Sequence, residues 1–151
     1  MNPQIVEKQA FTAVGMRIRT NPKSNEISEL WTKQGQRLDE VPNAVPGGTY
    51  GIMDIVDMDA GIMDYMAAVG ITEVGDMPDG MCQWDIPSAT YAVFEATLPT
   101  LGNSFDTFYQ EWLPNSDYER AAGPEFEHYG PTFNPHEPDS KLSVSIPVKN
   151  R

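Results

Sequence analysis

The 151-residue sequence contains a single cysteine, Cys82. One thiol cannot form a disulfide within the chain, and it excludes every zinc site that needs several cysteines. Cys82 lies in the segment MCQWDI, near Met81 and Trp84. We therefore interpret it as a small apolar packing residue rather than a nucleophile.

Basic residues are also scarce. Ten Lys and Arg oppose 22 Asp and Glu, so the net charge is −12, and the isoelectric point is near 4.3. Nucleic-acid affinity depends on basic side chains that neutralise phosphates. The densest basic pair, Arg17 and Arg19, lies in a strand-like segment, so we expect no direct nucleic-acid binding. A negative field attracts cations. The alternative is that the acidity only keeps the protein soluble.

Long apolar runs are absent. No segment approaches the ~20 apolar residues that span a bilayer, and the N-terminal MNPQIVEKQA has no basic-then-apolar signal pattern. Hydrophobic residues make up 40% of the chain, which is enough for a real core. These features predict a soluble, single-domain, cytoplasmic protein without membrane association.

Common cofactor and metal motifs are missing as well. The sequence has no Gly-rich phosphate loop, no GxSxG elbow and no HExxH. The acidic series Asp54, Asp57, Asp59 and Asp64 fails the EF-hand pattern, because the sixth residue from Asp57 is Ile62 instead of glycine. We therefore expect neither a metal site nor a cofactor.

Hydrophobic periodicity predicts the secondary structure. Alternation of apolar and polar residues is typical of strands, as in Val14, Met16 and Ile18. Two segments instead show the helical spacing of apolar residues, and each ends near a proline, Pro42 and Pro114. Strands are expected at 11–19, 49–57, 64–74, 89–97, 125–130 and 141–149, and helices at 24–41 and 104–115.

The order of these elements is strand, helix, strand, strand, and then the same again. We interpret this as a weak internal duplication of residues 1–76 and 87–150 within one domain covering 1–151. The expected fold class is α+β. The two units would form one antiparallel sheet, with two helices on one face and a groove between them for a ligand.

Several stretches resemble a known family. They include PQIVEKQAFTAVGMR, ISELW, the TYG strand, YMAAVGITEV, IPSATYAVFEA, YQEWLPNSDYE, FEHY and SVSIPVK. In this order they resemble the GyrI-like domain, also called the AraC-type effector-binding domain, over essentially the whole chain. The resemblance implies the same duplicated fold and binding of lipophilic, often cationic small molecules between the helices.

The resemblance implies several biological roles. Members of this family are usually the sensor half of a transcription regulator, some sequester drugs or toxins, and some resemble hydrolases that open cyclopropane-bearing genotoxins. We interpret the family-like region as running from Met1 to Arg151, which leaves no room for a helix-turn-helix domain. We therefore expect a stand-alone binder similar to mobile-cassette proteins, and a regulatory role would need a separate DNA-binding partner.

Glu127 is the leading site candidate. In PEFEHYG, alternation places Glu125, Glu127 and Tyr129 on one face of a strand, and Phe126 and His128 on the other. The resemblance places the family's recurring acidic residue on Glu127. A carboxylate in an aromatic groove would be costly to ionise until a bound cation compensates it. The alternative is a surface glutamate on an edge strand.

Aromatic residues would supply the walls of the groove, since their faces accept cations. Tyr50 and Trp112 are the preferred wall residues, and ordinary core packing is the alternative for each aromatic. The candidates are Trp31 and Trp112 on the helices, and Tyr50, Tyr65, Tyr91 and Tyr129 on the strands.

Three functions remain open at this point. The preferred one is a non-catalytic module that binds lipophilic cations. The second is a hydrolase of strained electrophiles, with Glu127 as general base. The third is an effector-sensing partner of a transcription regulator or a topoisomerase.

Overall fold

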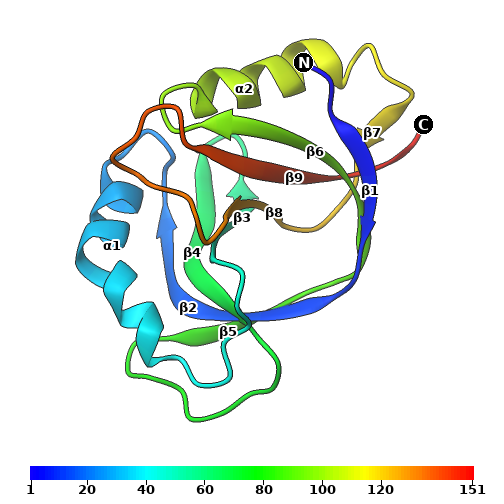
Figure 1. Cartoon of the computed structure of the whole chain (residues 1–151). Coiled ribbons are helices and arrows are strands. Elements are labelled where there is room, and N and C mark those ends of the chain that lie inside the picture. The colour runs from blue at the N-terminus through cyan, green and yellow to red at the C-terminus, as the bar shows by residue number, and fades with distance from the viewer.

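In the computed structural model, which describes residues 1–151, nine β-strands form one antiparallel sheet that curves strongly (Figure 1). The strands are β1 Gln4–Lys8, β2 Phe11–Thr20, β3 Thr49–Asp57, β4 Ile62–Ile71, β5 Cys82–Ile86, β6 Ala89–Thr97, β7 Tyr118–Arg120, β8 Glu125–Tyr129 and β9 Lys141–Asn150. The short strands β1, β5 and β7 were not predicted as separate elements. Each pairs with one neighbour only, so its sequence carries a weaker pattern.

The order of the strands is β1-β6-β9-β8-β3-β4-β2-β5, with β7 paired to β9. The path ends at β1 and β5, so the sheet is open and not a closed barrel. The two halves of the sheet have the same strand order when each is followed toward the centre. One half has the order β2-β4-β3 and the other has β6-β9-β8. This is the arrangement of two strand–helix–strand–strand units that meet at β3 and β8. The exact boundaries 1–76 and 87–150 stay a prediction.

Both helices are shorter than predicted. Helix α1 covers Glu26–Gln34 and continues as a 3₁₀ segment, Gly35–Glu40. Glycine is a poor helix former, which favours the change at Gly35. Helix α2 covers Leu101–Thr107 and continues as a π-helical segment, Phe108–Trp112. There the Leu113 N–H donates to the Phe108 carbonyl oxygen at 2.8 Å, five residues back.

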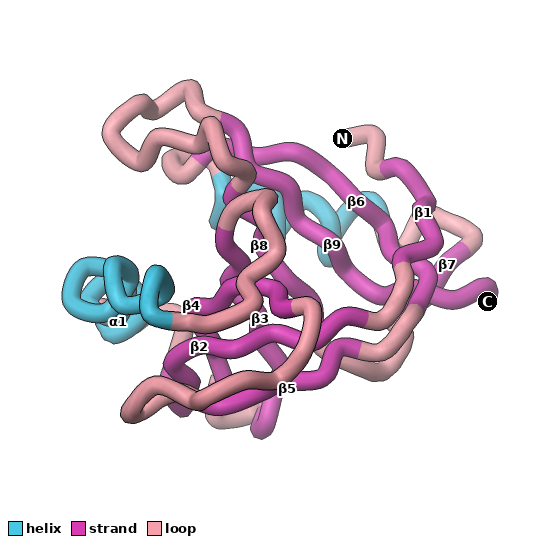
Figure 2. Tube along the Cα trace, turned by 60° about the horizontal axis from the view of Figure 1, so that its bottom comes forward, coloured by secondary structure: helices cyan, strands magenta, loops and turns pink.

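The helices cover the same face of the sheet at different places. Helix α1 contacts β2 and β4, whereas α2 contacts β6, so the central strands β3 and β8 lie between them (Figures 1 and 2). Leu30 of α1 packs in one buried cluster with Tyr65 of β4, and Phe108, directly after α2, packs in a second with Val144 of β9. Phe105 of α2 packs against both clusters. Those central strands therefore form the sheet surface between the two helices.

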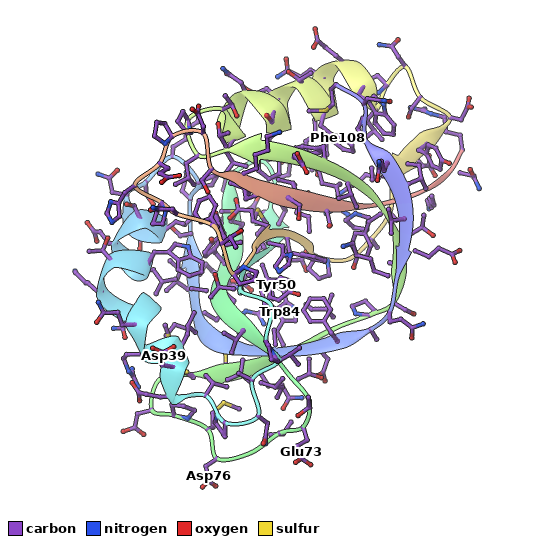
Figure 3. All side chains as sticks on the ribbon, in the orientation of Figure 1. Asp39, Tyr50, Glu73, Asp76, Trp84 and Phe108 are labelled. Carbon is purple, nitrogen blue, oxygen red and sulfur yellow. The ribbon has the colours of Figure 1, made fainter.

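The opposite face of the sheet has its own core inside the curve. Ile52, Met66, Tyr91 and Phe126 are at most 2% exposed there. Figure 3 places Tyr50 and Trp84 toward this inner side. None of the helices has the length and apolar character that a membrane crossing requires.

Candidate functional site

Glu127 lies near the centre of the sheet. Strand β8 places it opposite Gly51 of β3 and Val144 of β9, and only 6% of the residue is exposed. The predicted alternation is confirmed, because Glu125 and Glu127 face the helix side while Phe126 joins the inner core. The alternative of a surface glutamate on an edge strand is wrong, since β8 has a neighbour on each side.

The Glu127 carboxylate has no basic partner. The phenol groups of Tyr129 and Tyr65 both donate to its Oε1 atom, at 2.8 and 3.2 Å. No Lys, Arg or His forms a salt bridge with it, and no protein group donates to Oε2. Burial raises the pKa of Glu127 to about 7, although the two phenol hydrogen bonds act in the opposite direction.

A chain of donors connects α1 to this carboxylate. The indole N–H of Trp31 donates to the Tyr65 hydroxyl oxygen at 2.8 Å, and the Tyr65 O–H donates to Glu127. Burial, followed by the negative charge of Glu127, raises the pKa of the Tyr65 phenol well above its ordinary value. Both effects also raise the pKa of Tyr129. The phenols therefore remain protonated donors throughout the neutral range.

Gly51 leaves the space in which these groups meet. A Cβ atom at this position would lie 2.2 Å from the Tyr65 hydroxyl oxygen and 2.6 Å from Glu127 Oε1. Sequence reasoning did not identify Gly51 as a site residue. Its only signal was a glycine inside a strand, which often marks a close approach of other groups.

A second buried acid lies two residues before Glu127. Glu125 is 6% exposed, but it accepts a hydrogen bond from Tyr109 and pairs with Arg120 at 3.7 Å. Burial raises the pKa of Glu125, while the Tyr109 hydrogen bond and the Arg120 charge act to lower it. The same strand face thus carries one acid with a cationic partner and one without. Sequence reasoning noted the shared face but missed Arg120 and Tyr109.

Aromatic rings surround the unpaired carboxylate. Trp31 and Tyr129 meet edge to face with centroids 5.7 Å apart, and Phe133 contacts Tyr129 at 4.9 Å. Four of the predicted site residues therefore lie together, namely Glu127, Tyr65, Tyr129 and Trp31. Phe133 was not predicted, because it lies in a loop without periodicity.

The other three predicted site residues lie elsewhere. Tyr50 stacks on His128 at 4.6 Å, and Tyr91 packs edge to face with Phe126, both on the inner face. The register pairs Tyr50 with His128 and not with Glu127, which turns it away from the carboxylate. Trp112 stacks on Phe108 within the π-helical segment that follows α2. The structure does not bring these three to Glu127.

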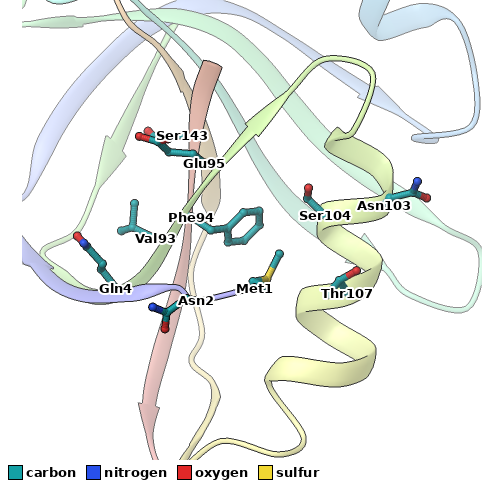
Figure 4. A pocket seen from close by; sticks show the side chains of 10 residues that line it. All are labelled: Met1, Asn2, Gln4, Val93, Phe94, Glu95, Asn103, Ser104, Thr107 and Ser143. Atoms are coloured by element: carbon teal, nitrogen blue, oxygen red, sulfur yellow. The ribbon is translucent and has the colours of Figure 1, made fainter. Parts of the chain in front are cut away.

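Two hollows of the surface are separate from Glu127. One, with a volume of about 730 Å³, lies between the N-terminal segment, β6 and α2, and its lining includes Gln4, Phe94 and Thr107 (Figure 4). The other, of about 290 Å³, includes Trp112. Neither of these two hollows therefore gives a ligand access to the carboxylate.

The two arginines noted in the sequence share one carboxylate. Arg17 and Arg19 both bind the Asp64 carboxylate, at 2.9 and 3.0 Å. The hydrogen bond from Arg19 is the largest cause of the lowered pKa of Asp64. Outward acidic residues such as Glu73 and Asp76 remain unpaired at the periphery (Figure 3).

Comparisons with known proteins place the chain among small-molecule-binding domains. A family model described as GyrI-like small molecule binding domain matches residues 1–149. The transcriptional regulator BrlR of Pseudomonas aeruginosa is 32% identical over 152 residues, which is 98% of this chain and 56% of the regulator. The chain therefore spans about half the length of this curated relative.

Solved structures show the same fold. The chain is similar to SAV2435 bound to tetraphenylphosphonium, with 22% identity and a TM-score of 0.79, covering 99% of this chain and 94% of that one. It is also similar to the integron cassette protein VCH_CASS2 from the mobile metagenome of Vibrio cholerae. There the identity is 19% and the TM-score 0.66, with 98% of this chain and 96% of that one covered.

Proposed function

Because the chain belongs to the GyrI-like family of small molecule binding domains, we propose that it binds lipophilic cations between α1 and α2, with Glu127 as the counter-charge. One observation carries the proposal. Glu127 is almost fully buried, yet its partners are two phenols and no cation. A buried carboxylate is costly unless it is protonated or paired. A ligand cation would provide the missing pair.

The aromatic residues support a lipophilic ligand. Tyr129 donates a hydrogen bond to the carboxylate, Trp31 and Phe133 each pack against the Tyr129 ring, and ring faces attract cations. Glu127 is 6% exposed and neither hollow reaches it, so a bulky ligand would contact it only after a ring such as Trp31 or Tyr129 turns aside. The tetraphenylphosphonium bound by SAV2435 has the charge and shape that such a site would accept.

The test is calorimetric titration with tetraphenylphosphonium, and with tetraphenylborate as an anion of the same shape. The Glu127→Gln variant should weaken phosphonium binding tenfold or more, because a close charge pair is lost. Glu73→Gln is the matched control, since it removes the same charge from an exposed position. Unchanged affinity in Glu127→Gln, or equal binding of the borate, would contradict the proposal.

The hydrolase alternative depends on the same residue. A carboxyl group with a pKa of about 7 suits a general base at neutral pH. Incubation with a cyclopropane-containing alkylator separates the two functions. Ring opening above the uncatalysed rate, lost in Glu127→Gln, would favour hydrolysis, whereas recovery of the intact compound favours binding.

The biological role that we propose for binding is sequestration, or sensing together with a DNA-binding partner. The similarity to BrlR, a transcriptional regulator, supports the second possibility. A cation-dependent complex between this chain and a DNA-binding protein would distinguish sensing from sequestration.

A further inference from the structure

The two buried acids of β8 differ in one respect. Glu125 and Glu127 face the same side of the strand, and both are 6% exposed. Alternate residues of a strand lie about 6.6 Å apart. Glu125 pairs with Arg120, with Nη2 and Oε2 3.7 Å apart, whereas no basic residue pairs with Glu127. A ligand cation would therefore meet one carboxylate without a basic partner, Glu127, and one that is already paired, Glu125.

Arg120 is held in place by several acceptors. Its guanidinium donates to the backbone carbonyl oxygens of Ala121 and Gly123, and its Nε–H donates to the Tyr109 hydroxyl oxygen at 3.2 Å. Tyr109 in turn donates to Glu125. Tyr109 lies in the π-helical segment after α2, and Arg120 lies in β7. Contacts from β7 and from the π-helical segment thus hold the Arg120 guanidinium beside Glu125.

We propose that Arg120 determines the charge selectivity of the site, because it neutralises Glu125 and leaves only Glu127 to meet a ligand cation. The inference rests on the proposed function. The protein would then take lipophilic monocations in preference to dications of similar size. A dication would have to place its second charge beside Arg120, where like charges repel. Without Arg120, two carboxylates at this spacing would suit a dication.

The experiment compares hexyltriphenylphosphonium with a dication of similar size, a triphenylphosphonium whose four-carbon chain ends in a trimethylammonium group. Calorimetry gives the ratio of dication to monocation affinity for each variant. In Arg120→Met, the ratio should rise tenfold or more, as expected for a new close charge pair. In the double variant Arg120→Met with Glu125→Gln, the ratio should return to the wild-type value. A lost fold lowers both affinities and does not produce this pattern.

A second variant keeps the inference testable if Arg120→Met does not fold. Glu125→Gln leaves the Arg120 charge without its carboxylate partner, and this charge would then repel the second charge of a dication. The affinity of the dication relative to that of the monocation should therefore fall by about threefold or more. A ratio that stays the same in the folded variants would overturn the role of Arg120. Absence of monocation binding to the wild-type protein would instead overturn the proposed function itself.

Discussion

The buried carboxylate should make Glu127→Gln a stabilising substitution at high pH. The pKa of Glu127 is raised to about 7 from an ordinary value of 4.5, mainly by burial. A shift of this size corresponds to about 3 kcal/mol against the ionised form in the folded state. Glutamine resembles the protonated acid, since its amide oxygen can still accept hydrogen bonds from Tyr65 and Tyr129.

The sign of the pH dependence follows from linkage. Because the folded-state pKa is raised, the stability that Glu127 contributes is fully present below about pH 4.5 and is lost as the pH rises to about 7. The Glu127→Gln variant has no ionisable group at this position, so it does not lose this stability as the pH rises. The free energy of unfolding of Glu127→Gln minus that of wild type should therefore grow by about 3 kcal/mol between pH 4 and pH 8. For a chain of this length, the melting temperature at pH 8 should rise by roughly 6–12 °C.

The assay is urea unfolding at half-unit pH steps, followed by tryptophan fluorescence. Glu73→Gln serves as the control, because its exposed carboxylate carries no burial cost, and its difference from wild type should stay flat. If the Glu127→Gln difference is also flat from pH 4 to pH 8, the carboxylate is solvated or already paired. That result would refute the reasoning without any use of a ligand.

Four other outcomes are expected. Affinity for tetraphenylphosphonium should rise about tenfold from pH 6 to pH 8, since the ionised fraction of a group with a pKa of about 7 rises by that factor; pH-independent affinity would argue against pairing with Glu127. Added salt should slow association more than it speeds dissociation in stopped-flow experiments, because the field of the −12 charge is screened over ~8 Å while a buried pair is shielded; a mainly faster dissociation would contradict this. Gly51→Ala should cost about 1–3 kcal/mol of stability by overpacking and weaken cation binding, because the new methyl group would displace Tyr65 and Glu127; calorimetry that finds wild-type affinity would exclude this role. Ser145→Ala should be neutral or stabilising by up to about 1 kcal/mol in urea unfolding, since the buried Ser145 hydroxyl has no hydrogen-bond partner; a large loss of stability would reveal a partner.

Local patterns in the sequence determined the elements and their faces. Alternation in strands and the spacing of apolar residues in helices are properties of neighbouring residues, so they can be read without a tertiary structure. The face of β8 that carries Glu125 and Glu127 was predicted in this way. The predicted helix ends lay beyond the observed ones, because the 3₁₀ segment after Gln34 and the π-helical segment after Thr107 continue the apolar spacing.

The site itself depended on contacts between distant parts of the chain. Tyr65 is 62 residues from Glu127 in sequence, and Trp31 is 34 residues from Tyr65. Only the order and register of the strands bring these groups together, at the position where Gly51 leaves space. The same register turns Tyr50 to the inner face, although the sequence had made it a preferred wall residue of the groove. Sequence by itself therefore predicted the face of β8 that carries Glu127, whereas the tertiary structure decided which aromatics meet this carboxylate and that Arg120 pairs with Glu125. Strand pairing is a long-range property, and a register change of one residue moves a side chain to the other face of the sheet.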